Sequence, residues 1–516
     1  MLLSGSAARW EERIRRVLVL VAVFTVPAVI AMQLTTVADP DLWCHLRTGQ
    51  WIAQHHIVPA TDQFSAFGID KPWVAYSWLF EVVLYFVYSV GGLLGLLVFK
   101  LFMILAVTAA VYHLVGRLQQ DFTWQVVLTS VAMISMAQSY TPRPWLMTIL
   151  FFVIEIDVLF AYRGQGKIRN LYALPPLFLL WANMHVQFFY GLFVLFLFAI
   201  EPPLSRMLAT HIPQIRPITR PAAPLWVSTV ICTAVTLVNP YGIRLYTDAF
   251  DLITQKSPFK YVTEFQALSF RQLSDYLLLA MLLAAVFMIA WTRCADWLYQ
   301  FLLIAGAILG FRCRRDLWFL AVVSTAILAA CLPARPNEKY VTTRAQRLGI
   351  GVAVVAALVS ILAFRGFSNA MLEKQVIEAF PYKAADFISH HELPGPLFNN
   401  YDWGGYLIWK LPSLPVSIDG RTDVHWDQRI VRSVETWAGK HDWSSDPDLI
   451  SAGLVIGPID APLTAILRLV PDYQVVYEDK TAVVFARKTP SSWRDVARTQ
   501  SPKREIRLRL LRYATE

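Results

Sequence analysis

Up to about residue 365 the chain alternates long apolar blocks with short polar links. An apolar block of about 17 to 25 residues is long enough to cross a bilayer as a helix. Blocks of this kind predict about eleven membrane spans. They lie near residues 17–34, 92–116, 124–140, 145–162, 170–184, 187–202, 222–238, 276–292, 297–311, 316–333 and 348–365. An odd number of spans would put the two ends of the chain on opposite sides of the membrane.

After residue 366 the apolar runs shorten and charges of both signs are interspersed. The pattern predicts a helix over 382–391, short strands over 396–399, 416–419 and 454–456, and a hairpin from 475–477 and 482–486. We therefore divide the chain into a transmembrane domain, 1–366, and a C-terminal α/β domain, 367–516. The basic tail from Ser491 onward is helix-prone, and a solvated surface helix is the favoured interpretation.

The positive charges of the first part predict an orientation. Arginines cluster before the first span and recur in alternate links, which is typical of cytoplasmic segments. They are Arg9, Arg13, Arg15 and Arg16; Arg117; Arg163, Lys167 and Arg169; Arg206, Arg216 and Arg220; Arg293; Arg335, Lys339, Arg344 and Arg347. We expect a multi-pass protein of the inner (plasma) membrane with a cytoplasmic N-terminus and an extracytoplasmic C-terminal domain. A cleaved signal peptide is less favoured, because the first apolar run is long for one.

Composition agrees with a membrane protein and excludes other classes. Of the 516 residues, 56% are hydrophobic and only 16% charged, well below the charge content of ordinary soluble enzymes. The net charge is +9, and part of the excess positive charge lies in the short links between apolar blocks, where it sets the membrane topology. The sequence shows no basic and aromatic module of the kind that binds nucleic acid. We therefore expect membrane lipid and no nucleic acid as partners. The five cysteines lack the paired spacing of a disulfide framework or zinc site.

Polar residues gather just after the first apolar run, at Asp39, Asp41, His45 and Arg47. Ionisable groups at the mouth of a span are costly and therefore suggest function. A carboxylate there can deprotonate an acceptor, orient an amide or help to ligate a divalent cation. Alternatively, Asp41 caps a helix that runs to about residue 53. A cap does not explain why His45 and Arg47 follow at a spacing that would place them near Asp41 on a helix, so a catalytic site is favoured.

This stretch resembles a known family. Residues 41–47, Asp-Leu-Trp-Cys-His-Leu-Arg, are similar to the first external loop of the catalytic subunit of oligosaccharyltransferases. They resemble, more loosely, the acidic loop motif of other GT-C glycosyltransferases. The resemblance implies a GT-C fold, a polyprenyl-phosphate-linked sugar donor, and a catalytic Asp41, as base or metal ligand, with Asp39 beside it.

A second resemblance lies in the C-terminal domain. Residues 400–408, followed by residues 418–422, are similar in layout to the Trp-Trp-Asp-Tyr-Gly segment and downstream Asp of oligosaccharyltransferases. The family's double Trp is replaced here by Asn400-Tyr401, which speaks against recognition of an Asn-x-Ser/Thr sequon. The resemblance implies acceptor contacts for Tyr401, Asp402 and Asp419. An equally favoured alternative is a tight turn at the two following glycines, capped by Asp402.

Four arginines are candidates for binding the donor phosphate, because guanidinium groups match phosphate oxygens in two-point contacts. Arg312, Arg314 and Arg315 lie in a link that our span count places outside, against the positive-inside tendency. A local inversion of the topology would explain them equally well. Arg143 stands between two prolines in another external link.

Other candidates for substrate or acceptor binding are His45, Arg47, His185 and Glu264. His185 lies in a turn between two spans, where a packing histidine is the more common alternative. Glu264 lies in the long link 239–275, which could close over a site as a lid. Metal-dependent relatives supply a second acidic cluster, whereas the link 140–144 has no carboxylate. Glu264 could substitute for that cluster. The metal question stays open: a divalent cation at Asp39 and Asp41 is the alternative to a metal-independent reaction, which we favour.

The combined prediction is a membrane glycosyltransferase of the cell envelope. It would transfer a sugar from a polyprenyl-phosphate donor to an extracytoplasmic acceptor, which could be a protein, a lipid or a polysaccharide, by a single inverting displacement. One alternative is a transporter or flippase for a lipid-linked sugar, but few ionisable residues lie within the spans, mainly Lys100, Glu155 and Asp157. Another is a non-catalytic cell-envelope scaffold, which the altered pair Asn400-Tyr401 would permit.

Overall fold

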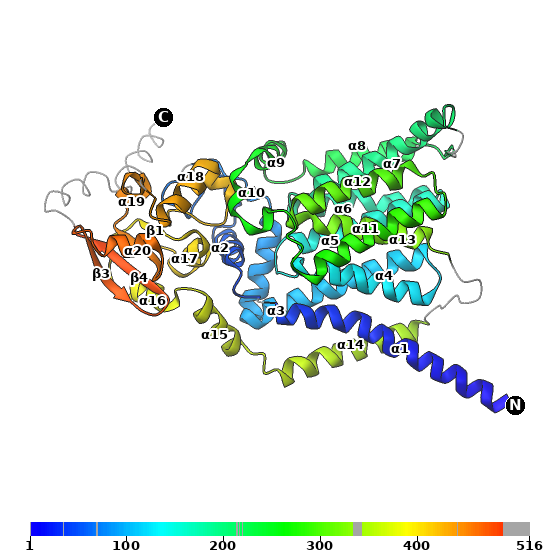
Figure 1. Cartoon of the computed structure of the whole chain (residues 1–516), viewed down its shortest axis with the longest axis horizontal. Helices are drawn as coiled ribbons and strands as arrows, with labels where there is room; N and C mark the ends of the chain where they lie inside the picture. Colours follow the sequence, from blue (N-terminus) through cyan, green and yellow to red (C-terminus); the bar gives the residue numbers. More distant parts are fainter. Residues whose placement is uncertain are drawn as a thin grey trace. The chain divides into compact units, whose positions relative to one another are not determined.

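The computed structural model describes residues 2–488, except 35, 69, 70, 213, 214, 216, 219, 334–342 and 441. The predicted basic tail, Arg216, Arg335 and Lys339 lie outside the described residues. The chain forms two compact units (Figure 1). The first comprises residues 1–63, 70–379 and 421–427, and the second comprises 64–69, 380–420 and the rest of the chain from 428. The sequence predicted a single boundary between residues 366 and 367. In the structure the first unit continues to residue 379 and also includes residues 421–427, whereas residues 64–69 belong to the second unit.

The first unit is helical. Its helices are α1 (Leu2–Gln33), α2 (Pro40–His55), α3 (Trp78–Leu118), α4 (Phe122–Ser135), α5 (Trp145–Gln165), α6 (Leu174–Met184), α7 (Phe188–Ala209), α8 (Ala223–Thr236), α9 (Arg244–Thr254), α10 (Ser257–Tyr261), α11 (Leu273–Trp291), α12 (Trp297–Arg312), α13 (Leu317–Cys331), α14 (Arg344–Phe364) and α15 (Asn369–Ala379). Among the described residues, six helices, α1, α3, α5, α7, α11 and α14, are long and apolar enough to cross a membrane, and α4, α8 and α12 are shorter apolar helices. A multi-pass membrane protein is thus confirmed, and the number of eleven spans stays a prediction.

Helix α13 lies at the centre of this bundle, and most of its side chains are buried. The ring of Phe152 on α5 packs against those of Trp318 and Phe319 on α13, with centroids 5.1 and 4.9 Å apart. Figure 1 shows α4, α5, α11 and α13 running side by side. The aromatic and aliphatic residues that made the sequence so apolar therefore serve helix-to-helix packing as well as contact with lipid.

Helix α3 is bent at Gly92, where φ is +60°. A Cβ atom there would lie 2.7 Å from Oδ1 of Asn369, which accepts a hydrogen bond from the backbone N–H of Leu94 at 2.8 Å. Only glycine fits both the backbone conformation and the close approach. The predicted span that begins at residue 92 is therefore the second of two helical segments of α3, which meet at the non-helical Gly92.

The second unit is the predicted small α/β domain. Its strands β1 (Leu397–Asn399), β2 (Leu454–Pro458), β3 (Tyr473–Glu478) and β4 (Ala482–Arg487) form one sheet in the order β1-β2-β4-β3. Strands β1 and β2 are parallel, and the other two pairs are antiparallel. Helices α16 (Tyr382–His390), α17 (Gly404–Lys410), α19 (Pro447–Ser451) and α20 (Pro462–Leu467), with the part of α18 (Thr422–Trp437) that follows residue 427, complete it.

Most predicted elements of this unit are present, and one differs. The predicted helix, the two strands near 397 and 454 and the hairpin of β3 and β4 are confirmed. The predicted strand over 416–419 forms only isolated bridges, from Val416 to Ser65 and to Leu397. The two glycines at 404 and 405 begin α17 instead of forming a free turn, and the cap of the preceding helical turn comes from Asn400, not from Asp402.

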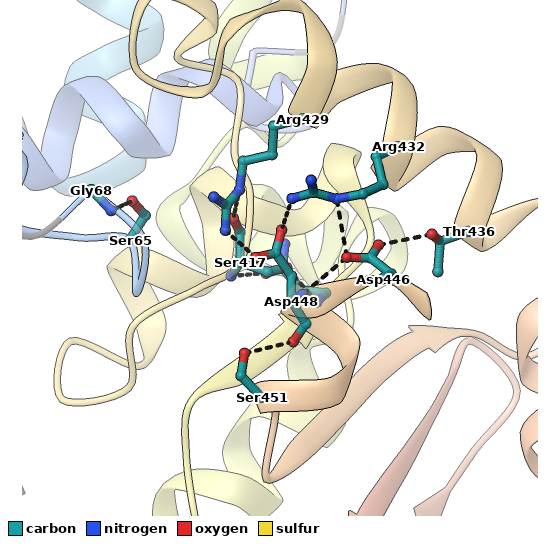
Figure 2. A network of polar contacts seen from close by, with 10 residues as sticks. Ser65, Gly68, Ser417, Arg429, Arg432, Thr436, Asp446, Asp448 and Ser451 are labelled. Atoms are coloured by element: carbon teal, nitrogen blue, oxygen red, sulfur yellow. Dashed lines mark hydrogen bonds and ion pairs between the residues drawn. The ribbon is translucent and has the colours of Figure 1, made fainter. Parts of the chain in front are cut away.

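An ion-pair network ties α18 to the start of α19 (Figure 2). Nη2 of Arg429 lies 2.5 Å from Oδ1 of Asp448, and Nη2 of Arg432 lies 3.0 Å from Oδ2 of the same carboxylate. Asp446 pairs with Nε of Arg432 at 3.2 Å and accepts a hydrogen bond from Oγ1 of Thr436 at 2.8 Å. Because Asp446 also caps α19, the network fixes the position of that helix.

Candidate active site

The stretch after α1 forms a sharp connection to α2. Lys100 Nζ donates hydrogen bonds to the carbonyl oxygens of Ala31 at 2.7 Å and Leu34 at 3.1 Å, close to the end of α1. Asp39 is the N-cap of α2, because its Oδ1 accepts a hydrogen bond from the backbone N–H of Asp41 at 3.1 Å. The sequence left open whether Asp41 caps a helix. In the structure Asp39 is the cap, so the side chain of Asp41 is available for other contacts.

Arg143 joins this connection to the turn before α5. Its guanidinium forms a two-point ion pair with Asp39, in which Nε lies 2.6 Å from Oδ2 and Nη2 contacts Oδ1. Nη1 lies 2.6 Å from Oδ2 of Asp41 and 2.5 Å from Oε2 of Glu264. Three carboxylates from separate segments therefore meet one guanidinium.

The environment of Asp41 favours its protonated form. Burial raises the pKa of the carboxyl group, Arg143 opposes the rise, and the neighbouring Glu264 and Asp39 add to it, so that the pKa reaches about 7. A quarter of the side chain is nevertheless exposed. A carboxylate with a pKa near neutrality that still reaches solvent can accept a proton and release it again.

Glu264 is supplied by the long link between α8 and α11. In place of an unstructured loop, this link contains α9, α10 and a short helical turn, Thr263–Phe265. The backbone N–H of Arg314 donates to the carbonyl of Gln266 at 3.0 Å, and that of Leu268 donates to the carbonyl of Phe311 at 3.2 Å. The link is thus fastened to the turn between α12 and α13, beside the arginines.

Arg315 lies in that turn and faces the same cluster. Its Nη1 is 4.0 Å from Oε1 of Glu264, and its guanidinium lies over the rings of Trp145 and Phe265 at 5.8 and 5.3 Å from their centroids. The Nε atom of Arg315 is buried and has no hydrogen-bond partner among the described residues. Arg315 therefore has a donor that no described residue uses, whereas Arg143 is committed to the carboxylates.

The turn that holds Arg315 is anchored by Asp316. Its Oδ1 accepts a hydrogen bond from Gln187 Nε2, and its Oδ2 accepts one from the Tyr190 hydroxyl, both at 2.8 Å. Burial raises the pKa of Asp316 to about 6. Both partners lie at the start of α7, so the turn before α13 is fastened to that helix end.

His185 contacts Arg315 from the turn between α6 and α7. It is 1% exposed, and its Nδ1 lies 2.8 Å from Oγ1 of Thr148. Burial and the charge of Arg315 lower the pKa of His185 well below its ordinary value. The sequence left open whether this histidine touches substrate or packs. It is buried, and its contacts are with the two side chains named here and with the ring of Tyr76.

The other candidates on α2 have different partners. His45 Nδ1 lies 2.9 Å from Oε1 of Glu81, at the start of α3. Nη1 of Arg47 donates to Oε1 of Gln50 at 2.6 Å. His45 lies close enough to Asp41 to lower its pKa, so the predicted face of α2 carries Asp41 and His45, while Arg47 bonds along the helix.

The remaining predicted residues lie apart from the cluster. Arg312 is exposed and lies over the ring of Phe259 at 4.9 Å. Arg314 is half-buried, and its Nε, like that of Arg315, is buried without a hydrogen-bond partner among the described residues. Tyr401, Asp402 and Asp419 belong to the second unit. There, Asp402 is exposed and Asp419 is fully buried against Gly404, where an added Cβ would lie 2.7 Å from the Cβ of Asp419.

Three residues of the site were not singled out from the sequence. Glu81 is a lone carboxylate at the start of an apolar run, which is a recognisable signal. Asp316 directly follows the three arginines. Thr148 carried no signal, because a threonine fits the pattern of an apolar helix, and only its hydrogen bonds with Trp181 and His185 reveal its place.

The acidic residues do not fit a divalent cation while Arg143 is in place. Asp39, Asp41 and Glu264 each direct an oxygen at its guanidinium, so a cation would have to displace this positive group to reach them. Within the described part of the chain, no three His, Cys, Asp or Glu side chains gather as a metal site. Asp41 and Glu264 share Nη1 of Arg143, and Arg315 lies 4.0 Å from the other oxygen of Glu264.

No protein-family model and no curated protein matches the sequence. Sixteen chains of solved structures match the fold, and two of them are membrane proteins with the following likeness. The oligosaccharyltransferase of Archaeoglobus fulgidus, in the apo form, matches with a TM-score of 0.52 and 12% identity over 85% of this chain and 69% of its own. ArnT from Cupriavidus metallidurans, bound to undecaprenyl phosphate, matches with a TM-score of 0.50 and 12% identity over 92% of this chain and 98% of its own. At this level of identity the likeness concerns the fold, and the predicted GT-C-like fold is confirmed.

Proposed function

We propose that this protein is a membrane glycosyltransferase that moves a sugar from a polyprenyl-phosphate donor to an acceptor. One observation carries the proposal: Asp41, with a pKa of about 7, lies in one cluster with Arg143, Glu264 and Arg315. The GT-C-like fold supports it, and so does the undecaprenyl phosphate bound to ArnT, one of the proteins with this fold.

The proposed reaction is one displacement at the anomeric carbon. The acceptor atom forms a bond to this carbon while the bond from the carbon to the phosphate oxygen breaks, and the phosphate leaves with the electron pair. Asp41 takes the proton from the acceptor. Arg315, with its unpaired Nε donor, stabilises the negative charge that grows on the leaving phosphate. A single displacement inverts the anomeric configuration.

The charge pattern supports a site on the extracytoplasmic side. Arg143 precedes α5, and Arg163 lies in the last turn of the same helix, so the cluster and the basic links lie at opposite ends of α5. Basic links favour the cytoplasm. The acceptor would therefore be an extracytoplasmic protein, lipid or polysaccharide.

The test is transfer by the purified protein from radiolabelled polyprenyl-phosphate sugars to an extract of cell-envelope acceptors. The Asp41→Asn variant should lose transfer, because the amide cannot accept the proton, while it elutes and melts as a folded protein. Asp472→Asn, which alters an exposed carboxylate of the second unit, is the matched control and should keep full activity. Undiminished transfer by Asp41→Asn would remove the central assignment.

The same preparation separates the alternatives. Movement of labelled lipid across vesicles without transfer or hydrolysis would indicate a transporter or flippase. Neither movement nor transfer would indicate a non-catalytic scaffold of the cell envelope.

A further inference from the structure

One guanidinium neutralises three carboxylates that come from distant parts of the chain. Asp39 precedes α2, Asp41 lies in its first turn, and Glu264 lies in the link between α8 and α11. All three contact Arg143, and its Nε, Nη1 and Nη2 are all used in doing so. Arg143 is therefore the centre of the cluster.

Arg143 is also held rigidly. It stands between Pro142 and Pro144, which restrict its backbone. Its guanidinium lies over the ring of Trp145 at 4.7 Å from the centroid, and its side chain is 13% exposed. The carboxylates around it raise its pKa above the ordinary value despite burial, which alone would lower it. A side chain fixed in this way is preorganised and does not need to move for each reaction cycle.

A hard divalent cation binds oxygen ligands such as carboxylates, but with Arg143 between them Asp39, Asp41 and Glu264 do not gather as a metal site in the described part of the chain. In this chain the positive charge at their centre is a guanidinium instead. We propose that Arg143 is a built-in substitute for a divalent cation, and that it holds Asp39, Asp41 and Glu264 together so that the site works without a metal. The part of this inference that concerns the reaction rests on the proposed function, whereas the part that concerns metal binding does not.

This inference divides the arginines by role. Arg143 is a positioning residue that acts through Asp41. Arg315 makes one 4.0 Å contact with Glu264 and keeps a donor unpaired, so of the two arginines beside Glu264 it is the one that we assign to the phosphate. The sequence had assigned both to phosphate binding.

The test exchanges the guanidinium for a neutral group and asks whether a metal takes its place. Mn²⁺, which suits carboxylate ligands, is titrated into the purified full-length protein and followed by electron paramagnetic resonance. We expect Arg143→Ala to bind one Mn²⁺ with a Kd at least about tenfold lower than that of wild type. The variant lacks the positive charge that repels the cation, and the loss of such a repulsion can change the Kd by more than this factor. The double variant Arg143→Ala/Asp39→Asn should lose this binding.

Arg143→Ala removes the positive charge that the three carboxylates share and could fail to fold. Arg143→Gln keeps hydrogen-bond donors in a side chain of similar length, and Arg143→Lys keeps the positive charge. Mn²⁺ should raise the melting temperature of the Gln variant and leave those of the Lys variant and of wild type unchanged. The inference is overturned if wild type itself binds Mn²⁺ in a manner that Asp41→Asn abolishes, or if neither neutral variant gains Mn²⁺ binding.

An activity measurement completes the test. Wild type should transfer sugar equally well with and without EDTA, and loss of transfer in EDTA that Mn²⁺ restores would overturn the inference. If no preparation transfers sugar under any condition, the proposed function fails. The Mn²⁺ titrations would still decide whether Arg143 occupies the place of a cation.

Discussion

Nη2 of Arg315 lies 3.1 Å from Nε2 of His185, two residues that are 130 positions apart in the chain. Arginine can only donate, so Nε2 accepts and the proton of the neutral imidazole sits on Nδ1. From there it is donated to Oγ1 of Thr148, which also accepts from Nε1 of Trp181 at 2.9 Å. The tautomer of a buried histidine is thus set by its neighbours, and the histidine in turn orients the guanidinium that we assign to the donor phosphate.

Replacing His185 should therefore weaken donor binding without touching the proton acceptor. In His185→Ala, Arg315 loses its acceptor, and we expect the KM for the polyprenyl-phosphate sugar to rise about tenfold, which corresponds to about 1.4 kcal/mol. His185→Gln can place an amide oxygen near the position of Nε2 and should recover much of the loss. Initial rates over a range of donor concentrations separate KM from kcat. An equal fall of kcat in both variants with an unchanged KM would contradict the positioning role.

The raised pKa of Asp41 predicts how activity depends on pH. A proton acceptor works only when ionised, so kcat/KM should rise with pH, pass its midpoint near the pKa of about 7 and then level off. The measurement is the initial transfer rate at a subsaturating donor concentration between about pH 5.5 and 8.5. A flat profile across this range would argue against Asp41 as the base.

The same shift predicts a change in stability. The pKa of Asp41 in the folded protein, about 7, lies above its ordinary value of 3.8, so the folded state disfavours the ionised form. Stability is therefore lost as the pH rises from about 4 to about 7 and is then constant. Asp41→Asn mimics the protonated form. It should melt at a higher temperature than wild type at pH 8 and at nearly the same temperature at pH 4.5.

Much of the fold was predictable because it depends on local patterns. Apolar blocks of membrane-spanning length identified the helical unit, and two short runs separated by the polar turn 478–481 identified the hairpin of β3 and β4. The pairing of Asp39 with Arg143 joins positions 104 residues apart. No periodicity encodes it, since the choice among several arginines depends on which helix ends come together.

The candidate site was accordingly predictable in part. Charged residues in unusual places singled out Asp41, Arg143, Glu264 and Arg315, which the structure brings into one cluster. The separate roles of these four residues could not be predicted, because they depend on which hydrogen-bond donors are already paired in the structure. His185 illustrates the limit: its sequence position suggested either role, and only burial and the contact with Arg315 distinguish them.

The close approach of α2 and α3 at Gly49 predicts that a single methyl group displaces the site. A Cβ at this position would lie 2.0 Å from the carbonyl oxygen of Glu81, and both are backbone-fixed. Gly49→Ala should force the helices apart and stretch the contact between His45 and Glu81. We expect a destabilisation of about 1 to 3 kcal/mol and a marked loss of transfer.

The matched control is Gly164→Ala in the last turns of α5. A Cβ there meets nothing within 4 Å, so this variant should melt at or slightly above the wild-type temperature, since alanine favours a helix. Thermal unfolding of both variants in the same detergent makes the comparison. Equal stability of the two would show that α2 can shift without cost.

In the second unit, Arg429 is the residue on which the network of Figure 2 most depends. Its side chain is 8% exposed, its guanidinium lies 3.4 Å from the ring centroid of Phe67, and burial lowers its pKa to about 10. Arg432 is 36% exposed and shares Asp448 with it. Removing Arg429 also removes its contact with the ring of Phe67 and leaves the paired Asp448 with less compensation inside the unit. After removal of Arg432, Asp448 keeps Arg429, and the buried Asp446 keeps its hydrogen bonds from Thr436 and from the backbone N–H of Asp448.

We therefore expect Arg429→Ala to destabilise the second unit by about 3 kcal/mol and Arg432→Ala by less than about 1 kcal/mol. Hydrogen exchange of the full-length protein measures the difference locally: amides of β2 and of α19, which Asp446 caps, should lose protection in the first variant and keep it in the second. Exchange in α5 and α13 should stay unchanged, because these helices belong to the other unit. If the two variants exchanged alike, the buried arginine would be no more important than its exposed neighbour, and the stability of α19 would have to come from the apolar contacts of Leu449 in the core of this unit.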